Sequence, residues 1–352
     1  MIDFIIVGRG LAANVIAHTL NEKNLSFTII GDENLSSCSK VAAGIWNPIV
    51  FKRFTKSWLA NELVPYLNQF YTNCGRKMGK NFITQRDLIK PFSEEQEKKL
   101  WLNKASTELI DFLDDTIYKH YTAELKNCNI LNEYGRVKQC GNLDIVEFLK
   151  ATALFFKPQL RNEIFDYTEL KIEADCVFYK DLVAKNIIFC EGYLVKNNPF
   201  FKWIPLKPVK GELLIIAAPD LKLSNQIFNK NGFLMDTKDN KFIIGATYEW
   251  DDLAEKTTEK GLVELQAKLN HLITCNYTII EQKTGIRPSS LDRRPIVGKH
   301  PRYTNLFVFN GLGTKGVMLA PYFAKKFVNF YQLKEELPKE VNVDRFYSYY
   351  AP

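Results

Sequence analysis

The stretch DFIIVGRGLAANVIAHTL, residues 3–20, decides the expected fold. Its apolar run at 4–7 predicts a strand, a glycine-containing turn follows, and residues 11–23 have the apolar spacing of a helix. β-Branched and aromatic residues at 26–30 predict a second strand. The order strand, turn, helix, strand indicates a β-α-β unit, in which ligands bind at the carboxyl ends of the strands.

The turn itself matches the dinucleotide-binding pattern. Gly8 permits the tight turn, and Gly10 allows a pyrophosphate to approach the backbone closely. The third position of the pattern accepts glycine or alanine, so Ala13 fits it. The helix that begins at Leu11 and Ala12 would direct its N-terminal amides at the phosphates. A tight turn without any ligand is the alternative, and the turn alone does not distinguish NAD, NADP and FAD.

The end of the second strand departs from this pattern. A carboxylate is expected about 20 residues after the turn, where it holds the ribose, but Gly31 occupies that position. Asp32 and Glu33 follow directly, so one of them reaches back, or the ribose is held in another way. No arginine stands nearby along the chain to bind a 2′-phosphate, which disfavours NADP.

Composition and charge exclude several classes of protein. The chain has 352 residues, 46% of them apolar and 25% charged, which is ordinary for globular proteins. No apolar run approaches the ~18 residues of a membrane span, and the N-terminus lacks the features of a signal peptide, so we expect a cytoplasmic protein. The net charge of +7 comes from dispersed residues rather than a basic tract, so nucleic acid is not an expected partner. The seven cysteines include no C-x-x-C spacing, and we expect reduced thiols and no metal site.

Strand and helix signals continue along the whole chain. Residues 305–331 repeat the opening order of strand, glycine turn and helix. The segment 144–156 is apolar on nearly all sides, so we expect a buried helix there. Further helices are expected over 59–73, which contains Pro65, and 259–273, and further strands over 182–193, 211–218 and 241–248. Because both chain ends carry a strand-to-helix turn, we expect one nucleotide-binding domain built from separate segments around a β-rich insertion.

Five further segments, in order along the chain, carry a resemblance to one family. They are SKVAAGIWNP (39–48), KPVKGE (207–212), IIGATYEW (243–250), TGIRPSSLDRRPIVG (284–298) and NGLGTKGVMLAP (310–321). Together with the N-terminal turn, they resemble the FAD-dependent oxidoreductases of the D-amino-acid oxidase type, the superfamily of glycine oxidase and sarcosine oxidase. The resemblance covers nearly the whole chain and is weakest over about residues 77–137.

The resemblance implies an α/β fold of the glutathione reductase and D-amino-acid oxidase type. In that fold a Rossmann-like FAD-binding domain carries an inserted antiparallel β substrate domain. We expect the FAD-binding domain to comprise residues 1–76, 138–201 and 286–352. The substrate domain would comprise residues 77–137 and 202–285.

The resemblance further implies an enzyme, an amine or amino-acid oxidase or dehydrogenase acting on a small substrate that bears a carboxylate. In this family a hydride passes from the carbon next to an amine to flavin N5, the imine hydrolyses, and oxygen or another acceptor reoxidises the flavin. The cofactor carries the redox step, which suits a chain with only four histidines. No cysteine matches a flavin-tethering position, so we favour noncovalent FAD.

Transferred residue by residue, the resemblance assigns most cofactor contacts to glycine-rich turns. The turn at Gly311, Gly313 and Gly316 would face the flavin, and the positive end of the helix behind it would stabilise negative charge on the reduced ring. The implied cofactor-binding residues are Gly8, Gly10, Leu11, Ala12, Ala13, Asp32, Ser39, Lys40, Ala42, Ala43, Gly44, Arg53, Glu191, Gly192, Arg287, Gly311, Leu312, Gly313, Thr314, Lys315 and Gly316.

Four residues are implied to act on the substrate. Arg287 would bind its carboxylate through the guanidinium fork, and Lys315 would lie near flavin and substrate. Lys56 would approach the carboxylate from a basic loop that also brings Arg53 beside the ring, and Tyr248 would line the pocket. The alternatives are a buried ion pair for the first arginine, solvated surface cations for the other basic residues and an ordinary strand aromatic.

Two alternative functions stay open. A relative within the same family removes a carboxymethyl group from a wobble uridine of tRNA, and the net charge of +7 permits that function here, although no basic tract favours it. The other alternative is a flavin-binding protein without amine turnover.

Overall fold

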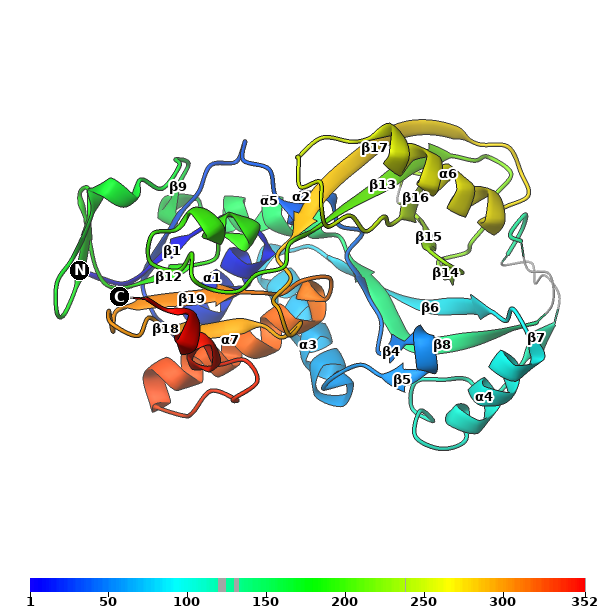
Figure 1. Cartoon of the computed structure of the whole chain (residues 1–352), viewed down its shortest axis with the longest axis horizontal. Helices are drawn as coiled ribbons and strands as arrows, with labels where there is room; N and C mark the ends of the chain where they lie inside the picture. Colours follow the sequence, from blue (N-terminus) through cyan, green and yellow to red (C-terminus); the bar gives the residue numbers. More distant parts are fainter. Residues whose placement is uncertain (120–124, 130–132, 238, 352) are drawn as a thin grey trace.

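The computed structural model describes residues 1–119, 125–129, 133–237 and 239–351. These residues form two large sheets that lie side by side, with both chain termini on the side of the first sheet (Figure 1). None of the helices in these ranges combines the length and the apolar character needed to cross a membrane. The cytoplasmic location expected from the sequence stays a prediction.

The first sheet has a parallel centre. Strands β12, β1 and β2 pair in parallel, and β19 and β9 continue the parallel arrangement. Antiparallel pairing adds β10, β11 and β18. The strands are β1 (Ile2–Val7), β2 (Phe27–Ile30), β9 (Leu160–Arg161), β10 (Leu170–Ile172), β11 (Val177–Tyr179), β12 (Leu182–Phe189), β18 (Ile296–Lys299) and β19 (Leu306–Asn310).

The central strand β1 is apolar throughout because both faces of its sheet are covered. Phe4, Ile5 and Ile6 are 0% exposed, and Val7 is 3% exposed. Phe4 and Ile6 belong to the core under the helices, whereas Ile5 and Val7 belong to the core on the other face. Such a continuous apolar run is typical of a buried parallel strand.

The helices predicted around this sheet are confirmed. The helix over 11–23 is α1 (Leu11–Glu22), and the helix over 59–73 is α3 (Ala60–Met78), which is longer than predicted and contains Pro65. The segment 305–331 forms β19 and then α7 (Gly316–Leu333), so it repeats the strand-to-helix turn of the N-terminus. Figure 1 shows α7 and α3 against the same side of the sheet.

The burial predicted for the helix over 144–156 is wrong on one face. This segment forms α5 (Ile145–Phe155), and its residues Phe148 and Thr152 are 0% exposed. Leu154 and Phe155, however, are 72% and 41% exposed. The reason is that α5 packs on α1 and α3 from one side, and an apolar composition does not reveal how many sides of a helix have neighbours.

The second sheet is antiparallel except for one parallel pair, β14 with β6. Helix α6 (Glu259–Leu272) packs on one side of it, and α4 (Glu95–Ala105) lies on the other side, as Figure 1 shows. Along the sheet the strands are β17 (Thr278–Arg287), β13 (Val209–Ala217), β16 (Phe242–Gly245), β15 (Phe233–Asp236), β14 (Ile227–Asn229), β6 (Ile83–Pro91), β8 (Glu133–Leu143) and β3 (Ile45–Trp46), with β7 (Tyr118–Lys119) beside β8.

Two of the predicted domain boundaries fall inside strands. The boundary at 138 lies within β8, which pairs with β6 from Tyr134 to Leu143 and therefore belongs to the second sheet over its length. The boundary at 286 lies within β17, which pairs with β13 up to Arg287. Both strands belong to the second sheet over their length, so these two predicted boundaries lie inside that sheet rather than at its border.

Short elements close the junction between the sheets. Helix α2 (Cys38–Val41) contacts β17 so closely that a Cβ at Gly285 would lie 3.1 Å from the Cα of Cys38. The hairpin of β4 (Ile49–Val50) and β5 (Thr55–Lys56) follows before α3. The backbones of α2 and β17 are therefore in close contact at the junction, and this contact helps to fix the relative position of the two sheets.

Replacing Trp101 of α4 by alanine should destabilise the packing of that helix on the second sheet. Its ring is 0% exposed and packs edge-on against Phe54 and Phe92, and its indole N–H donates to the Asp114 carbonyl (2.8 Å). We expect Trp101→Ala to lower the free energy of unfolding by about 3–5 kcal/mol in urea denaturation. The matched control Leu154→Ala, at an exposed position, should change it by less than about 0.5 kcal/mol. Equal effects of the two variants would contradict this packing.

Candidate active site

One cavity of about 940 Å³ runs along the junction of the two sheets. Its walls include the carboxyl ends of β1, β2 and β12 from the first sheet. The opposite walls come from β13, β14, β15 and β17 of the second sheet. The carboxyl ends of parallel strands are where open α/β sheets bind their ligands. The cavity is therefore in the position that the N-terminal turn predicts.

Most of the predicted site residues line this cavity. Those that do are Gly8, Gly10, Leu11, Ala12, Asp32, Ser39, Lys40, Ala42, Ala43, Gly44, Glu191, Gly192, Tyr248, Arg287, Leu312, Gly313, Thr314, Lys315 and Gly316. Ala13 and Gly311 are buried and do not line it, which for Ala13 agrees with a helix–strand contact position. Arg53 and Lys56 are exposed and lie off its walls.

The basic loop differs from its predicted placement. Arg53 and Lys56 were expected beside the ring and the carboxylate, but both face solvent. Phe54 is the residue between them that turns inward, with 2% exposure. Ser57, which is 3% exposed, accepts a hydrogen bond from Lys315. The loop therefore contributes to the site through a hydroxyl that the basic pattern did not single out.

The turn after β1 leaves its backbone open to a ligand. Gly8 has a φ of +121°, and a Cβ there would overlap the carbonyl oxygen of Cys190. Gly10 begins α1 without a side-chain cap, and the first turn of α1 has no acidic residue. The Asn14 side chain donates to the Gly10 carbonyl (2.8 Å) and steadies the turn. The Leu11 amide donates to the Ser39 hydroxyl (3.0 Å), and the other amides at the start of this helix, which has no side-chain cap, suit the pyrophosphate of a dinucleotide.

Gly31, at the end of β2, is packed against Arg9. A Cβ at Gly31 would lie 3.1 Å from the Arg9 Cβ and 3.2 Å from its Cγ. The Arg9 guanidinium is held by the Asn162 side chain (2.5 Å) and by Glu33 (3.7 Å). The sequence has no arginine beside Gly31 along the chain, but the turn after β1 brings one to it in space.

Glu191 lies on the other side of β1, directly after β12. The Cys190 amide donates to the Val7 carbonyl (2.7 Å), which fixes Glu191 beside the glycine turn. Its carboxylate accepts hydrogen bonds from the Tyr167 hydroxyl and from the Asn198 side-chain amide, the latter at 2.7 Å. Burial raises the pKa of Glu191 to about 7, against the effect of these two hydrogen bonds.

Arg287, the last residue of β17, projects into the cavity. Its guanidinium donates to the carbonyls of Lys210 (3.4 Å) and Thr247 (3.3 Å) and lies 4.7 Å from the centroid of the Tyr248 ring. A Cβ at Gly211 would overlap this guanidinium, so the conformation of Arg287 requires glycine there. Burial lowers the pKa of Arg287.

The buried ion pair considered for Arg287 is not present among the described residues. Asp292, the nearest acid along the chain, pairs with Arg345 instead (2.8 Å). Arg287 therefore brings a positive charge to the cavity wall that no described carboxylate neutralises. An anionic group of a ligand would neutralise it.

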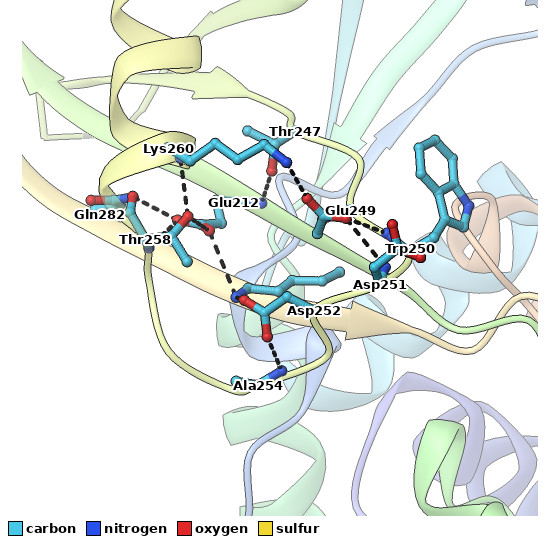
Figure 2. A network of polar contacts seen from close by, with 12 residues as sticks. Glu212, Thr247, Glu249, Trp250, Asp251, Asp252, Ala254, Thr258, Lys260 and Gln282 are labelled. Carbon is cyan, nitrogen blue, oxygen red and sulfur yellow. Dashed lines mark hydrogen bonds and ion pairs between the residues drawn. The ribbon is translucent and has the colours of Figure 1, made fainter.

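A polar network centred on two buried residues of β13 holds the loop 246–258, as Figure 2 shows. Lys210 and Glu212 of β13 are only 1% and 3% exposed. Lys210 pairs with Asp252 (2.8 Å), and Glu212 accepts hydrogen bonds from the Thr258 amide (3.0 Å) and hydroxyl (2.8 Å). Buried charges are stable only when they are paired and hydrogen-bonded, so this network fixes the loop on the strand.

The same loop carries an exposed aromatic pair at the edge of the cavity. The rings of Tyr248 and Trp250 stack with centroids 6.2 Å apart and an interplanar angle of 27°. They are 53% and 58% exposed. Between them, Glu249 accepts the Trp250 amide (3.0 Å) and pairs with Lys260 (2.5 Å), which holds the pair in place (Figure 2).

Lys315 brings a second uncompensated cation to the cavity. It precedes α7 and donates to the Ser57 hydroxyl, and no described carboxylate pairs with it. Burial, together with the positive charge of Arg294, lowers the pKa of Lys315 to about 8. Its charge therefore changes within the range of pH in which enzymes are assayed.

An apolar wall on the side of the second sheet was not predicted. Leu88, Leu213, Ile227 and Phe233 line the cavity from four different strands. Leu213 lies on the same face of β13 as Gly211, so this wall begins next to the guanidinium of Arg287. No motif marks these residues. Strand order is what brings them together.

The cysteines are all free thiols, as expected, and two of them, Cys38 and Cys190, line the cavity. Burial raises the pKa of both thiols. Within the described ranges no group of three or more His, Cys, Asp and Glu side chains could hold a metal ion.

A cavity that starts at a dinucleotide turn and ends against a second, antiparallel sheet defines an α/β enzyme of the dinucleotide-cofactor class. The family model described as DAO, FAD dependent oxidoreductase, matches residues 3–329, and the chain belongs to this family. FAD is therefore the cofactor for which the open turn at Gly8 and the uncapped start of α1 are suited.

Individual relatives agree with this family. Glycine oxidase from Bacillus subtilis (strain 168) is 28% identical over 172 residues, which are 45% of this chain and 46% of that protein. The tRNA 5-methylaminomethyl-2-thiouridine biosynthesis bifunctional protein of Leptospira interrogans is 23% identical over 412 residues, covering 96% of this chain and 58% of that protein. The chain thus spans about half the length of the curated relatives it matches.

A solved structure confirms the predicted fold. Glycine oxidase from Bacillus cereus ATCC 14579 superposes with a TM-score of 0.78 at 19% identity and covers 96% of both chains. The Rossmann-like sheet with an added antiparallel β region, expected from the sequence, is therefore the fold of this chain.

Replacing Gly8 by alanine should weaken the binding of FAD. The added Cβ would overlap the Cys190 carbonyl, so the turn must move away from the phosphates. We expect the affinity for FAD to fall by about 10- to 100-fold, measured by flavin fluorescence during titration of the apoprotein.

The matched control for this variant is Gly79→Ala. Gly79 also has a positive φ, +65°, but no atom lies within 4 Å of its added Cβ, and it follows α3 away from the cavity. It shares the backbone strain and should keep the affinity for FAD. The account of the turn fails if both variants bind FAD equally well.

Proposed function

We propose that this chain oxidises the C–N bond of a small amine or amino acid that bears a carboxylate. The observation that carries the proposal is Arg287, a guanidinium in the cavity with no described carboxylate partner. Glycine oxidase is the name of several relatives of this chain. Oxygen or another electron acceptor would complete the cycle.

In this proposal the cofactor and each residue of the site have a distinct chemical role. FAD, when bound beside the turns at Gly8 and Gly313, would supply the redox chemistry as acceptor of a hydride from the carbon next to the amine, and water would hydrolyse the imine product. The guanidinium of Arg287 binds the substrate carboxylate, because its planar fork suits two oxygens. Tyr248 covers the guanidinium, and Lys315 adds positive charge near the opposite wall.

The apolar part of the substrate would contact a hydrophobic wall of the cavity. This wall is formed by Leu88, Leu213, Ile227 and Phe233. Excluding water there strengthens the contact between the carboxylate and Arg287. The wall also favours an amine with apolar carbon over a highly polar one.

We further propose that FAD is held without a covalent bond. A thiol must ionise to attack an electrophile, and burial raises the pKa of Cys38 and Cys190, which keeps both protonated. The binding roles assigned above to the glycine turns and to Ser39, Lys40 and Asp32 are part of this proposal.

Arg287→Ala should raise the KM for carboxylate substrates by about 10- to 100-fold, since it removes a charged hydrogen-bond donor. The assay follows amine oxidation by oxygen consumption and, in parallel, with an artificial electron acceptor. The methyl ester of the same amino acid should be a poor substrate for both wild type and variant.

Arg76→Ala provides the control, because Arg76 is exposed on α3 outside the cavity. It should leave the KM unchanged. An Arg287→Ala protein that keeps the wild-type KM, and still prefers the acid to its ester, would remove the support for a carboxylate substrate at this position.

Lys315 should make substrate binding depend on pH. Below about pH 8 its ammonium is charged and attracts a carboxylate, and above that pH it becomes neutral, so affinity should fall as pH rises through about 8. The Kd of a carboxylate inhibitor, measured against pH, should lose this step in Lys315→Met and keep it in Arg287→Ala. A step of unchanged size in Lys315→Met would assign it to another group.

A second candidate is oxidation of an amine on a tRNA wobble uridine. Two observations favour it: the alignment with the tRNA-modifying relative covers 96% of this chain, and Tyr248 and Trp250 offer stacked rings to a base. An electrophoretic mobility shift assay of tRNA with the protein, repeated at increasing salt concentration, tests this second candidate. Binding that weakens as salt increases, together with loss of the oxidised flavin absorbance when tRNA is added, would favour tRNA over a free amino acid as the substrate.

A further inference from the structure

The end of β2 has no acid for the ribose of FAD and little space for one. The side chain of Arg9 fills the space in front of Gly31, with contacts of 3.1 and 3.2 Å to a Cβ placed there. Arg9 is itself tied to Asn162 (2.5 Å) and Glu33 (3.7 Å). A larger side chain at position 31 would crowd the Cβ and Cγ of Arg9, and the chain has none there, so the ribose must find its acid elsewhere or do without one.

Three acids line the cavity, and one of them is occupied by another task. Glu212 accepts hydrogen bonds from Thr258 and lies in the buried network under the loop 246–258. Asp32 accepts the backbone amide of Asn34 (2.7 Å), which closes a local turn, and it is the rival acid that the experiment below separates from Glu191. Glu191 is the third acid.

The position of Glu191 follows from the pairing of β12 with β1. Val7 and Phe189 are opposite each other in this parallel pair, and the Cys190 carbonyl lies against Gly8. Glu191 is thus the first residue beyond the contact that shapes the phosphate turn. Its carboxylate lies on the cavity wall together with Tyr167, at the end of the cavity that β1 and β2 also border.

The hydrogen bonds of Glu191 leave capacity for a ligand. An ionised carboxylate can accept about four hydrogen bonds, and the structure provides two, from Tyr167 and Asn198. Both donors are neutral, and no described cation pairs with the carboxylate. A half-buried carboxylate with only neutral partners is stabilised by further donors, and vicinal hydroxyls of a ribose are donors of the right kind.

We infer that Glu191 holds the adenosine ribose of FAD, and so takes the role for which the end of β2 has no side chain. Tyr167 and Asn198 position its carboxylate, one on each oxygen. The inference rests on FAD as the cofactor and does not depend on which amine the enzyme oxidises.

Titration of the apoprotein with FAD and with two FAD analogues, lacking either the 2′- or the 3′-hydroxyl of the adenosine ribose, tests this role. Flavin fluorescence gives each Kd without any turnover. Wild type should bind FAD about 10- to 100-fold more tightly than at least one analogue, as expected for loss of a hydrogen bond to a charged group. Glu191→Gln should reduce this ratio to within about threefold, because a neutral amide accepts a weaker hydrogen bond.

Glu169→Gln, at an exposed acid outside the cavity, is the matched control and should keep the wild-type ratio, whereas Asp32→Asn tests the rival acid on the cavity wall. Glu191→Asp is a second variant that retains the charge but withdraws the carboxylate by one methylene, and it should also reduce the ratio. Circular dichroism and thermal unfolding establish that the variants are folded. The inference is overturned if both Glu191 variants keep the wild-type ratio, or if Asp32→Asn alone loses it.

Discussion

The absence of a side chain at Gly8 is the constraint on which the rest of the structure depends. The carbonyl of Cys190 lies where a Cβ would be, so β1 and β12 can meet in this register only around glycine. The same contact places Glu191 and the start of α1 on either side of the turn. A dinucleotide binds where the backbone is bare, because its phosphates need amide donors at close range.

The second sheet uses a similar device at Gly211, whose missing side chain leaves space for the guanidinium of Arg287. The buried Lys210 and Glu212 then hold the loop above that guanidinium through Asp252 and Thr258 (Figure 2). Because these groups are fixed by the protein's own contacts, a ligand need not order them when it binds, and less of its binding free energy is lost.

Local sequence predicted the elements that carry the cofactor cavity, namely β1, the glycine turn, α1 and the repeat of this order at 305–331. It could not predict features that depend on packing between distant segments. The basic residues of the loop 52–58 suggested that its cations enter the site. In the structure Phe54 packs inward, whereas Arg53 and Lys56 face solvent. The contact of Arg9 with Gly31 and the convergence of four strands in the apolar wall depend on strand order, which no local pattern encodes.

The central claim is that an amine bearing a carboxylate reduces FAD inside the cavity between the two sheets. Anaerobic titration of the FAD-loaded protein with glycine, sarcosine, proline and D-amino acids, followed by flavin absorbance, tests it most directly. The account predicts that at least one of these amines bleaches the oxidised flavin. A flavin that stays oxidised with all of them, or a protein that cannot be loaded with FAD, would contradict it.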